Sequence, residues 1–299
     1  MTGKLPLMRL LETRAAELSP SQRRIARHLL ANYQAVAFST VADVARAAEV
    51  SEATVVRFAT ALGFSGYPAL QAEVRRMVRA DLKGTERFRL SERERPPGSG
   101  ALERLAAAEL DNLRQLRETA DVAALGAAAK ALRAARRVLV VGARGAAPLA
   151  FHLWFALDKL GLDVTRSLAA DTEALDRIGR LDKRDAVVAI GFPRYLRSLV
   201  AQLDLAGLRG ACRIVVTDSP FAPFKGEIGL YTPAVSASFV AFHAAPLVLL
   251  NALIEEVAAS DREATLAALA AFEAVAEQQS YFVPSRGRPQ PGREDAHGG

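Results

Sequence analysis

The feature that most constrains the fold is a regular alternation of short apolar runs and helical segments that begins at residue 137. The apolar runs occupy residues 137–142, 162–167, 185–192, 213–218 and 228–235, and helical patterns occupy 146–160, 171–180, 194–208 and, weakly, 219–226. Strands that alternate with helices and are apolar on both faces are typical of a parallel sheet covered by helices. The sequence therefore predicts an α/β domain with a five-stranded parallel sheet flanked by helices.

The first quarter of the chain has a different character. Residues 1–83 contain helical periods and no strand-like run, which predicts an all-α domain. They hold 12 Lys and Arg against 7 Asp and Glu, a net charge of +5, whereas the remainder of the chain carries +1. A small basic unit joined to a nearly neutral larger one suggests a polyanionic partner for the small unit.

Two short amphipathic patterns lie on either side of a turn in this basic unit. Apolar residues recur on one helical face over 41–48 and again over 55–62, and Glu49 and Val50 lie between the two patterns. Gly63 is placed to end the second helix. Two short helices across a turn of three or four residues form a helix-turn-helix unit.

The outward face of the second helix supplies candidate DNA contacts. In such a unit the start of this helix meets the base edges, and arginine can bind guanine through two hydrogen bonds. Hydroxyls at helix N-termini can cap the helix and bind phosphates. The candidate DNA-binding residues are Ser39, Thr40, Ser51, Ala53, Thr54, Arg57 and Thr60.

Periodicity alone leaves an alternative open, an ordinary helical hairpin with a solvated Arg/Thr face. The residues themselves resemble those of a known family, and this resemblance favours DNA binding. Residues 5–82 closely resemble the N-terminal domain of the RpiR family of bacterial transcription regulators, most specifically in "SEATVVRFATALGFSGYPAL". This stretch resembles the recognition helix of that family and the Gly-Phe-x-Gly-Tyr turn that follows it. We expect Phe64 and Tyr67 to pack this turn rather than to stack on bases.

Residues 137–257 resemble the sugar-isomerase (SIS) domain that RpiR-type regulators carry, usually as a sensor of phosphosugars. The stretch "VLVVGARGAAPLAFHLWFALDKLGLDV" is similar to the first strand, loop, helix and second strand of a SIS domain. The stretch "DAVVAIGFPRYLRSLVAQLDLAGLRGACRIVVTDSPFAPF" is similar to the third strand through the loop after the fourth. In an open parallel sheet, ligands bind at the carboxyl ends of the strands. The ligand is therefore expected near 142–145, 192–198 and 217–219.

The loops of this chain depart from the usual SIS pattern, in which serine and threonine hydroxyls surround a phosphate. The first loop is "GARGAA" and the second is "GFPRYLRS", so arginines replace most of the hydroxyls. Arginine binds carboxylate or phosphate through a planar fork. The candidate effector-binding residues are Gly142, Arg144, Gly145, Arg194, Arg197, Ser198, Thr217 and Ser219. They indicate a small anionic metabolite, a carboxylate or a differently held phosphate; the alternative is a vestigial pocket in a domain that only dimerises.

Enzymatic function is not expected. We find no pair of acid and base that a sugar-phosphate isomerase requires, and no metal-ligand cluster, Walker loop or dinucleotide fingerprint that would imply a metal or cofactor. His152 and His243 fall within apolar helical patterns and are expected in the core. Ser236 and Ser238 precede the last predicted core helix, which we expect them to cap. An isomerase with an added helical domain remains the competing class.

The expected organisation is a helix-turn-helix domain at 1–83, a linker at 84–100, a SIS-like effector-binding and oligomerisation domain at 101–283 and a disordered tail at 284–299. The longest apolar stretch, 239–259, has too short an uncharged part to span a membrane, so it is expected to form a buried helix. The expected location is the cytoplasm, which a single cysteine also fits. The expected partners are a double-stranded DNA operator, a small anionic effector and further copies of the chain in a homodimer or homotetramer.

Overall fold

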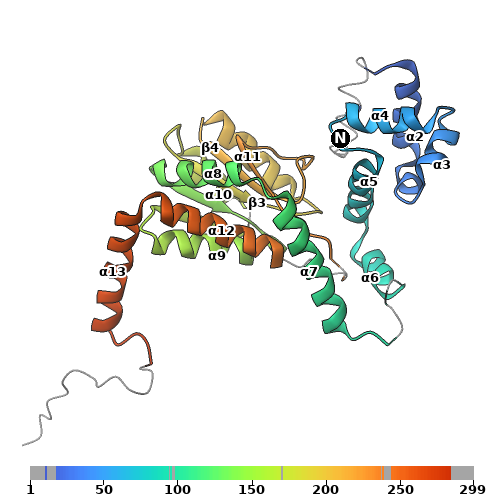
Figure 1. Ribbon diagram of the computed structural model, residues 1–299. Coiled ribbons are helices and arrows are strands. Elements are labelled where there is room, and N and C mark those ends of the chain that lie inside the picture. The colour runs from blue at the N-terminus through green and yellow to red at the C-terminus, as the bar shows by residue number, and fades with distance from the viewer. Residues whose placement is uncertain are drawn as a thin grey trace, which may run out of the picture.

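The computed structural model describes residues 11, 18–93, 95, 98–169, 171–236, 238 and 244–283, with the backbone alone at 79–81. The N-terminal helices lie at one side of a larger α/β unit (Figure 1). They are α2 (Pro20–Val36), α3 (Val41–Ala47), α4 (Glu52–Ala61) and α5 (Tyr67–Asp81), followed by α6 (Gly84–Arg93). Helices α7 (Ala101–Thr119) and α8 (Val122–Ala134) then lead into the sheet.

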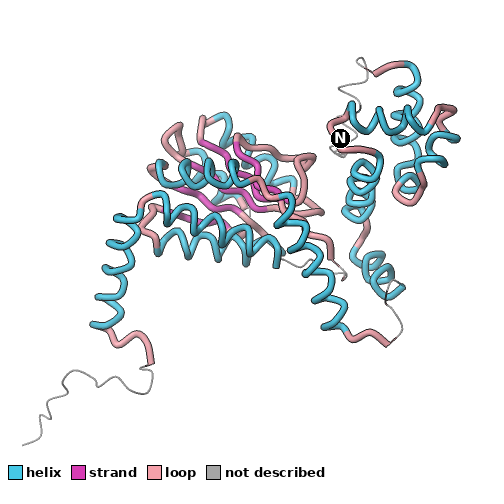
Figure 2. Tube along the Cα trace, in the orientation of Figure 1, coloured by secondary structure: helices cyan, strands magenta, loops and turns pink. Residues whose placement is uncertain are grey.

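The α/β unit contains one parallel sheet in the order β2-β1-β3-β4-β5. Its strands are β1 (Val138–Val141), β2 (Val164–Ser167), β3 (Ala186–Ile190), β4 (Cys212–Thr217) and β5 (Ile228–Tyr231). The other elements are η1 (Arg144–Ala146), α9 (Ala147–Lys159), α10 (Thr172–Gly179), α11 (Arg197–Leu208), α12 (Ala244–Ser260) and α13 (Arg262–Gln278). Figure 2 shows the strands with helices on either side. The expected five-stranded α/β fold is confirmed.

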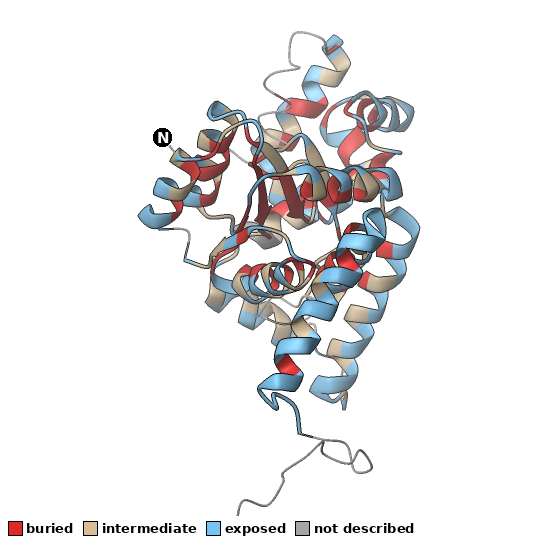
Figure 3. Cartoon of the chain, turned by 90° about the vertical axis from the view of Figure 1, so that its left-hand side faces the viewer, coloured by how far each residue is buried: buried red, intermediate tan, exposed pale blue. Residues whose placement is uncertain are grey.

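Alternate residues of the central strands β1 and β3 enter two different cores, which explains why these strands are apolar throughout. Val138 and Val140 pack with α8, α9 and α12, whereas Leu139 and Val141 pack with α10 and α11. Both central strands are buried along their whole length, whereas the edge strands β2 and β5 are partly exposed, and red marks the buried residues in Figure 3. Helices cover both faces of the sheet, so its carboxyl edge is where loops are available for binding.

The N-terminal helices have a separate core. Val55, Phe58 and Ala59 of α4 are wholly buried, and Leu70, Val74 and Met77 of α5 pack in the same cluster. The expected one-sided pattern of α4 is therefore present in three dimensions.

Two segments differ from expectation. The weak helical pattern over 219–226 is wrong: these residues form turns and bends, because Pro220 and Pro223 remove backbone donors. The segment expected as the linker, 84–100, begins with helix α6, although it lacks an apolar period. Its role in joining two domains remains a prediction, and the expected tail from residue 284 lies outside the described residues.

The apolar stretch near the C-terminus forms α12, whose Leu249, Leu250 and Leu253 are buried against the sheet. In the part of the chain that the structure describes, no helix combines the length and apolarity needed to cross a membrane.

Candidate functional site

The helix-turn-helix unit holds α4 by its apolar face and leaves the opposite face accessible. Ala53, Val56, Arg57 and Thr60 are exposed, and Thr54 is half-buried. The Arg57 Nη2 atom donates to Thr54 Oγ1 at 3.2 Å, which aligns the guanidinium along the helix surface. All the residues expected at base edges therefore lie on one accessible helix face.

The helix ends are defined by the hydroxyls that the sequence indicates. Thr40 is the N-cap of α3 and forms a capping box with Asp43. The Thr40 hydroxyl and backbone N–H both donate to the Asp43 carboxylate, and these two bonds lower its pKa. Ser51 caps α4 by accepting from Thr54 N. Ser39 does not cap; its hydroxyl donates to Ala35 O. Gly63 follows α4 with φ +94°, as its expected terminal role requires.

The turn between α3 and α4 is fixed by a distant side chain. Glu49 has φ +54°, a conformation that costs free energy for a residue with a Cβ. Arg24 of α2 donates to the carbonyl oxygens of Ala48 and Glu49 at 3.1 and 3.0 Å. These bonds fix the turn relative to α2, and they thereby fix the orientation of α4 relative to α2 and α3.

Helix α5 connects this unit to its surroundings. Tyr67 and Gln71 both donate to Ser39 O, and Arg75 Nε donates to Ala37 O at 2.6 Å. Tyr67 is 5% exposed, so it packs the turn as expected, and burial raises its pKa. Phe64 stacks on Phe221 of the α/β unit with ring centroids 4.9 Å apart.

A buried ionic cluster joins α5 to the carboxyl ends of β3 and β4. Arg76 binds both carboxylate oxygens of Glu73, at 2.6 and 2.9 Å, and its Nη1 donates to Asp218 Oδ2 at 2.9 Å and to the Tyr195 hydroxyl at 2.8 Å. Tyr195 donates to Asp218, and Ser219 donates to Glu73. The Arg76, Glu73 and Asp218 side chains are only 16%, 8% and 5% exposed. We call these five residues the Arg76 cluster.

The electrostatics of the cluster follow from its burial. Burial disfavours the charged form of Arg76, but its hydrogen bonds to Glu73 and the charge of Asp218 outweigh burial and raise the pKa of the guanidinium. Burial and the charge of Asp218 raise the pKa of Tyr195, so its hydroxyl stays protonated and remains a donor. Arg76 therefore stays charged, and Tyr195 stays neutral, around neutral pH.

A cavity of about 730 Å³ lies beside the Arg76 cluster. Helices α5 and α6 form one wall, and the segments that follow β3, β4 and β5 form the other. Its volume is in the range of small-molecule sites. The carboxyl edge of the sheet thus borders a space that α5 and α6 partly enclose.

The expected effector residues are distributed unevenly around this edge. Ser219 lines the cavity, and Thr217 is buried beneath it, where its hydroxyl donates to Asp218. Arg144, Gly145, Arg194, Arg197 and Ser198 are exposed and lie outside the cavity lining. Arg144 and Arg194 have φ of +56° and +71°, so both loops hold an arginine in a conformation that L residues disfavour.

Gly142 has a packing role. A Cβ at this position would lie 2.8 Å from Ala150 Cβ and 3.0 Å from Ala146 O. Glycine therefore allows α9 to approach the end of β1. Its involvement in effector binding stays a prediction.

Three further expectations need correction or remain open. Ser236 and Ser238 do not cap α12, which begins at Ala244; they line the cavity. His152 is only partly buried, and its Nε2 lies 2.7 Å from Asn251 Oδ1. His243 lies outside the described residues.

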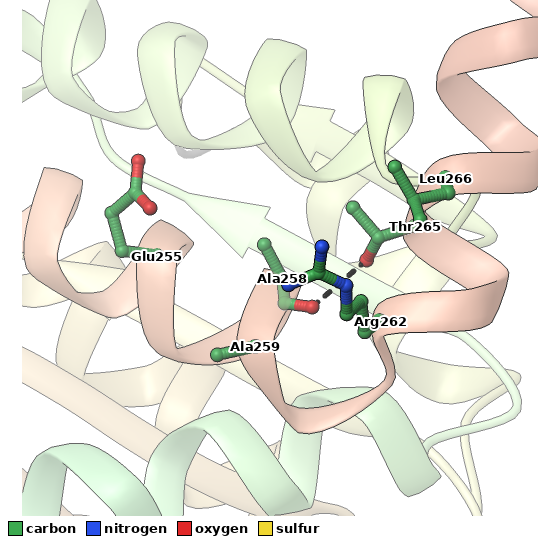
Figure 4. A pocket seen from close by; sticks show the side chains of 6 residues that line it. All are labelled: Glu255, Ala258, Ala259, Arg262, Thr265 and Leu266. Atoms are coloured by element: carbon green, nitrogen blue, oxygen red, sulfur yellow. Dashed lines mark hydrogen bonds between the residues drawn. The ribbon is translucent and has the colours of Figure 1, made fainter.

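A second hollow, of about 410 Å³, lies at the corner between α12 and α13 (Figure 4). It is lined by Glu255, Ala258, Ala259, Arg262, Thr265 and Leu266, and the Thr265 hydroxyl donates to Ala258 O at 3.0 Å. In Figure 1 this corner lies on the side away from the N-terminal helices. Nothing in it resembles a site for chemistry, and the described residues contain no cluster of His, Cys, Asp and Glu that could hold a metal.

Family models match both parts of the chain. Residues 6–80 match the helix-turn-helix domain of the rpiR family, and residues 131–256 match the SIS domain. The chain therefore joins a helix-turn-helix domain of the rpiR family to a SIS domain. The family resemblance and the two-part fold predicted from the sequence are confirmed.

Two of the relatives that resemble this chain carry regulator names. The HTH-type transcriptional regulator HexR of Pseudomonas aeruginosa is 38% identical over 68 residues, which cover 23% of this chain and 24% of HexR. An uncharacterized HTH-type transcriptional regulator of Haemophilus influenzae is 22% identical over 209 residues, 69% of this chain and 72% of the relative. The second relative thus resembles this chain over both of its domains, and HexR over the helix-turn-helix domain alone.

Two solved structures share the fold. The sugar isomerase domain of an RpiR transcription factor from Sphaerobacter thermophilus is 26% identical, with a TM-score of 0.54. The match covers 57% of this chain and 96% of that domain. The NanR protein of Vibrio vulnificus, solved as a complex with ManNAc-6P, is 18% identical with a TM-score of 0.56, and covers 93% of this chain and all of NanR.

Sequence reasoning missed the Arg76 cluster. Arg76 and Glu73 are three residues apart on a helix, a spacing that by itself predicts an ordinary surface pair. Tyr195 and Asp218 lie 119 and 142 residues further along the chain. The only local signal was that Tyr195 and Asp218 fall in the two loops already expected to face a ligand.

Proposed function

We propose that this regulator binds an operator through α4 and that its SIS domain binds a small anionic metabolite which alters operator binding. In this proposal the base edges are contacted by Ala53, Thr54, Arg57 and Thr60. The phosphates are contacted by Ser39, Thr40 and Ser51. The accessible polar face of α4 and the basic charge of residues 1–83 support this assignment.

The observation that carries the proposal is the Arg76 cluster beside the cavity. The DNA-binding unit contributes Arg76 and Glu73, and the carboxyl edge of the sheet contributes Tyr195, Asp218 and Ser219. A ligand that favours one arrangement of this contact over another changes the population of DNA-binding conformations. In this proposal a ligand in the cavity therefore affects DNA binding through one buried contact, the Arg76 cluster.

An anionic ligand is favoured by the arginines of this edge. Arg144, Arg194 and Arg197 are exposed, and among the described residues their guanidinium groups have no hydrogen-bond or ion-pair partner. Guanidinium groups that lack an internal counter-ion are available to a carboxylate or phosphate. The proposed effector site also includes Gly142, Gly145, Ser198 and Thr217.

Subunit pairing is the other proposed role of the SIS domain. Phe151 and Phe155 of α9 and Leu247 and Val248 of α12 are about half exposed. The two helices pack side by side on one face of the sheet (Figure 1). Exposed apolar residues gathered on neighbouring helices are typical of protein interfaces. We expect the chain to sediment as a dimer or tetramer, and a monomer at micromolar concentration would contradict this part.

The test is operator affinity of the full chain, measured with sugar phosphates, sugar acids and other small carboxylates. An operator is first selected from random duplex DNA. We expect one anion class to change the affinity, and Arg144→Ala to abolish that response while leaving ligand-free DNA binding intact. Equal operator affinity with every compound would indicate a constitutive regulator with a vestigial pocket. A response that Arg144→Ala retains would place the ligand away from the first loop.

A further inference from the structure

The walls of the cavity between α5, α6 and the sheet edge are mostly apolar. Phe64, Phe192, Phe221, Leu82 and Leu90 contribute side chains to it. Such walls suit a ligand whose body is organic and whose polar groups are few.

Most polar side chains at the cavity already have partners within the protein. Glu73, Arg76, Asp218 and Ser219 bind one another, and the Ser91 hydroxyl donates to Phe88 O at 2.8 Å. Arg75 donates to Ala37 O and to Gln71. These groups are satisfied without a ligand.

Arg87 of α6 is different. It lines the cavity, and its Nε atom is buried with no hydrogen-bond partner among the described residues. A buried N–H without an acceptor costs free energy, and native proteins contain few of them. Such a donor at the wall of a cavity is explained if a ligand supplies the acceptor.

The charge around Arg87 indicates the kind of acceptor. Burial and the positive charge of Arg194 both lower the pKa of the Arg87 guanidinium. Arg194 belongs to the loop after β3, in the left-handed conformation described above. A buried guanidinium in positive surroundings is stabilised by an anion that approaches it.

We propose that Arg87 binds the negatively charged group of a small organic anion in this cavity, beside the carboxyl edge of the sheet. This inference rests on the proposed anion-sensing function and deepens it. The helix that follows the DNA-binding unit then forms part of the effector site, so the ligand touches α6 and the SIS domain together. Carboxylate and phosphate share the required chemistry.

The experiment measures the thermal unfolding midpoint of the full chain with inorganic phosphate and, separately, with butyrate, both against chloride at equal ionic strength. A ligand that binds only the folded state raises the midpoint. The variants are Arg87→Ala and, as a matched control, Arg89→Ala, because Arg89 is an exposed arginine of the same helix. We expect one of the anions to raise the midpoint of the wild type and of Arg89→Ala.

In Arg87→Ala we expect the apparent affinity for that anion to fall by about tenfold or more. A response to phosphate alone identifies a phosphate site, and a response to butyrate alone a carboxylate site. If Arg87→Ala responds like Arg89→Ala while Arg144→Ala loses the response, anion sensing stands and the assignment of Arg87 is wrong. If neither anion shifts the wild-type midpoint, the cavity is not an anion site.

Discussion

Replacement of Arg76 by alanine is expected to lower the free energy of unfolding by about 3–5 kcal/mol, because the Glu73 and Asp218 carboxylates would stay buried without their counter-ion. The loss includes the hydrogen bond from Arg76 to Tyr195. Urea denaturation of the full chain, followed by circular dichroism, measures the change. We also expect the N-terminal helices to unfold before the α/β unit in the variant, since the ionic contact between them is lost and the stacking of Phe64 on Phe221 remains.

Arg114→Ala is the matched control for this experiment. Arg114 and Asp111 form an ion pair of the same i,i+3 spacing on α7, but their side chains are 66% and 73% exposed. Exposed pairs contribute about 0–1 kcal/mol. Equal losses in Arg76→Ala and Arg114→Ala would contradict the conclusion that the Arg76 cluster is buried and joins the two units.

Replacement of Arg57 by alanine is expected to weaken operator binding by about 1–3 kcal/mol, the range for one specific base contact. Arg57 is exposed on the outward face of α4, so the substitution leaves the core of the helix-turn-helix unit unchanged. Fluorescence anisotropy with operator DNA and with unrelated duplex DNA measures the two affinities. The expected loss is larger on the operator, because base contacts are lost only there.

Arg46→Ala controls for the loss of positive charge near DNA. Arg46 lies at the exposed end of α3, where it pairs with Asp43. We expect this variant to weaken both DNAs about equally, since its charge acts on the phosphate backbone. If Arg57→Ala also weakens both DNAs equally, or weakens neither, the assigned outward face of α4 is wrong.

Much of the fold follows from local sequence patterns. The apolar positions of α4, the hydroxyl of Thr40 and the glycine at position 63 define the helix-turn-helix unit within 25 residues, so their effects are visible in the sequence. The central strands β1 and β3 are predictable because both of their faces are buried. The weak helical pattern over 219–226 failed because this segment contains two prolines.

The candidate site is less predictable, because its contacts join distant parts of the chain. The loops after β3 and β4 were expected at a ligand site from the rule for parallel sheets. That Asp218 and Tyr195 bind Arg76 depends on how α5 packs against the sheet edge, which no periodicity encodes. Arg87 could not be predicted from the sequence for a related reason, because it lies in a segment that resembles a linker. Only the packing of the chain shows that its Nε atom is buried.

The most direct test of the coupling between the two units is the operator affinity of Asp218→Asn. This substitution keeps the size of the side chain but removes the charge that pairs with Arg76, far from the DNA-contacting face of α4. We predict that the operator affinity changes by about threefold or more, in either direction. The affinity for unrelated DNA changes by the same factor only if the substitution displaces α4 as a whole. An affinity equal to that of the wild type, in a variant that remains folded, would contradict the account.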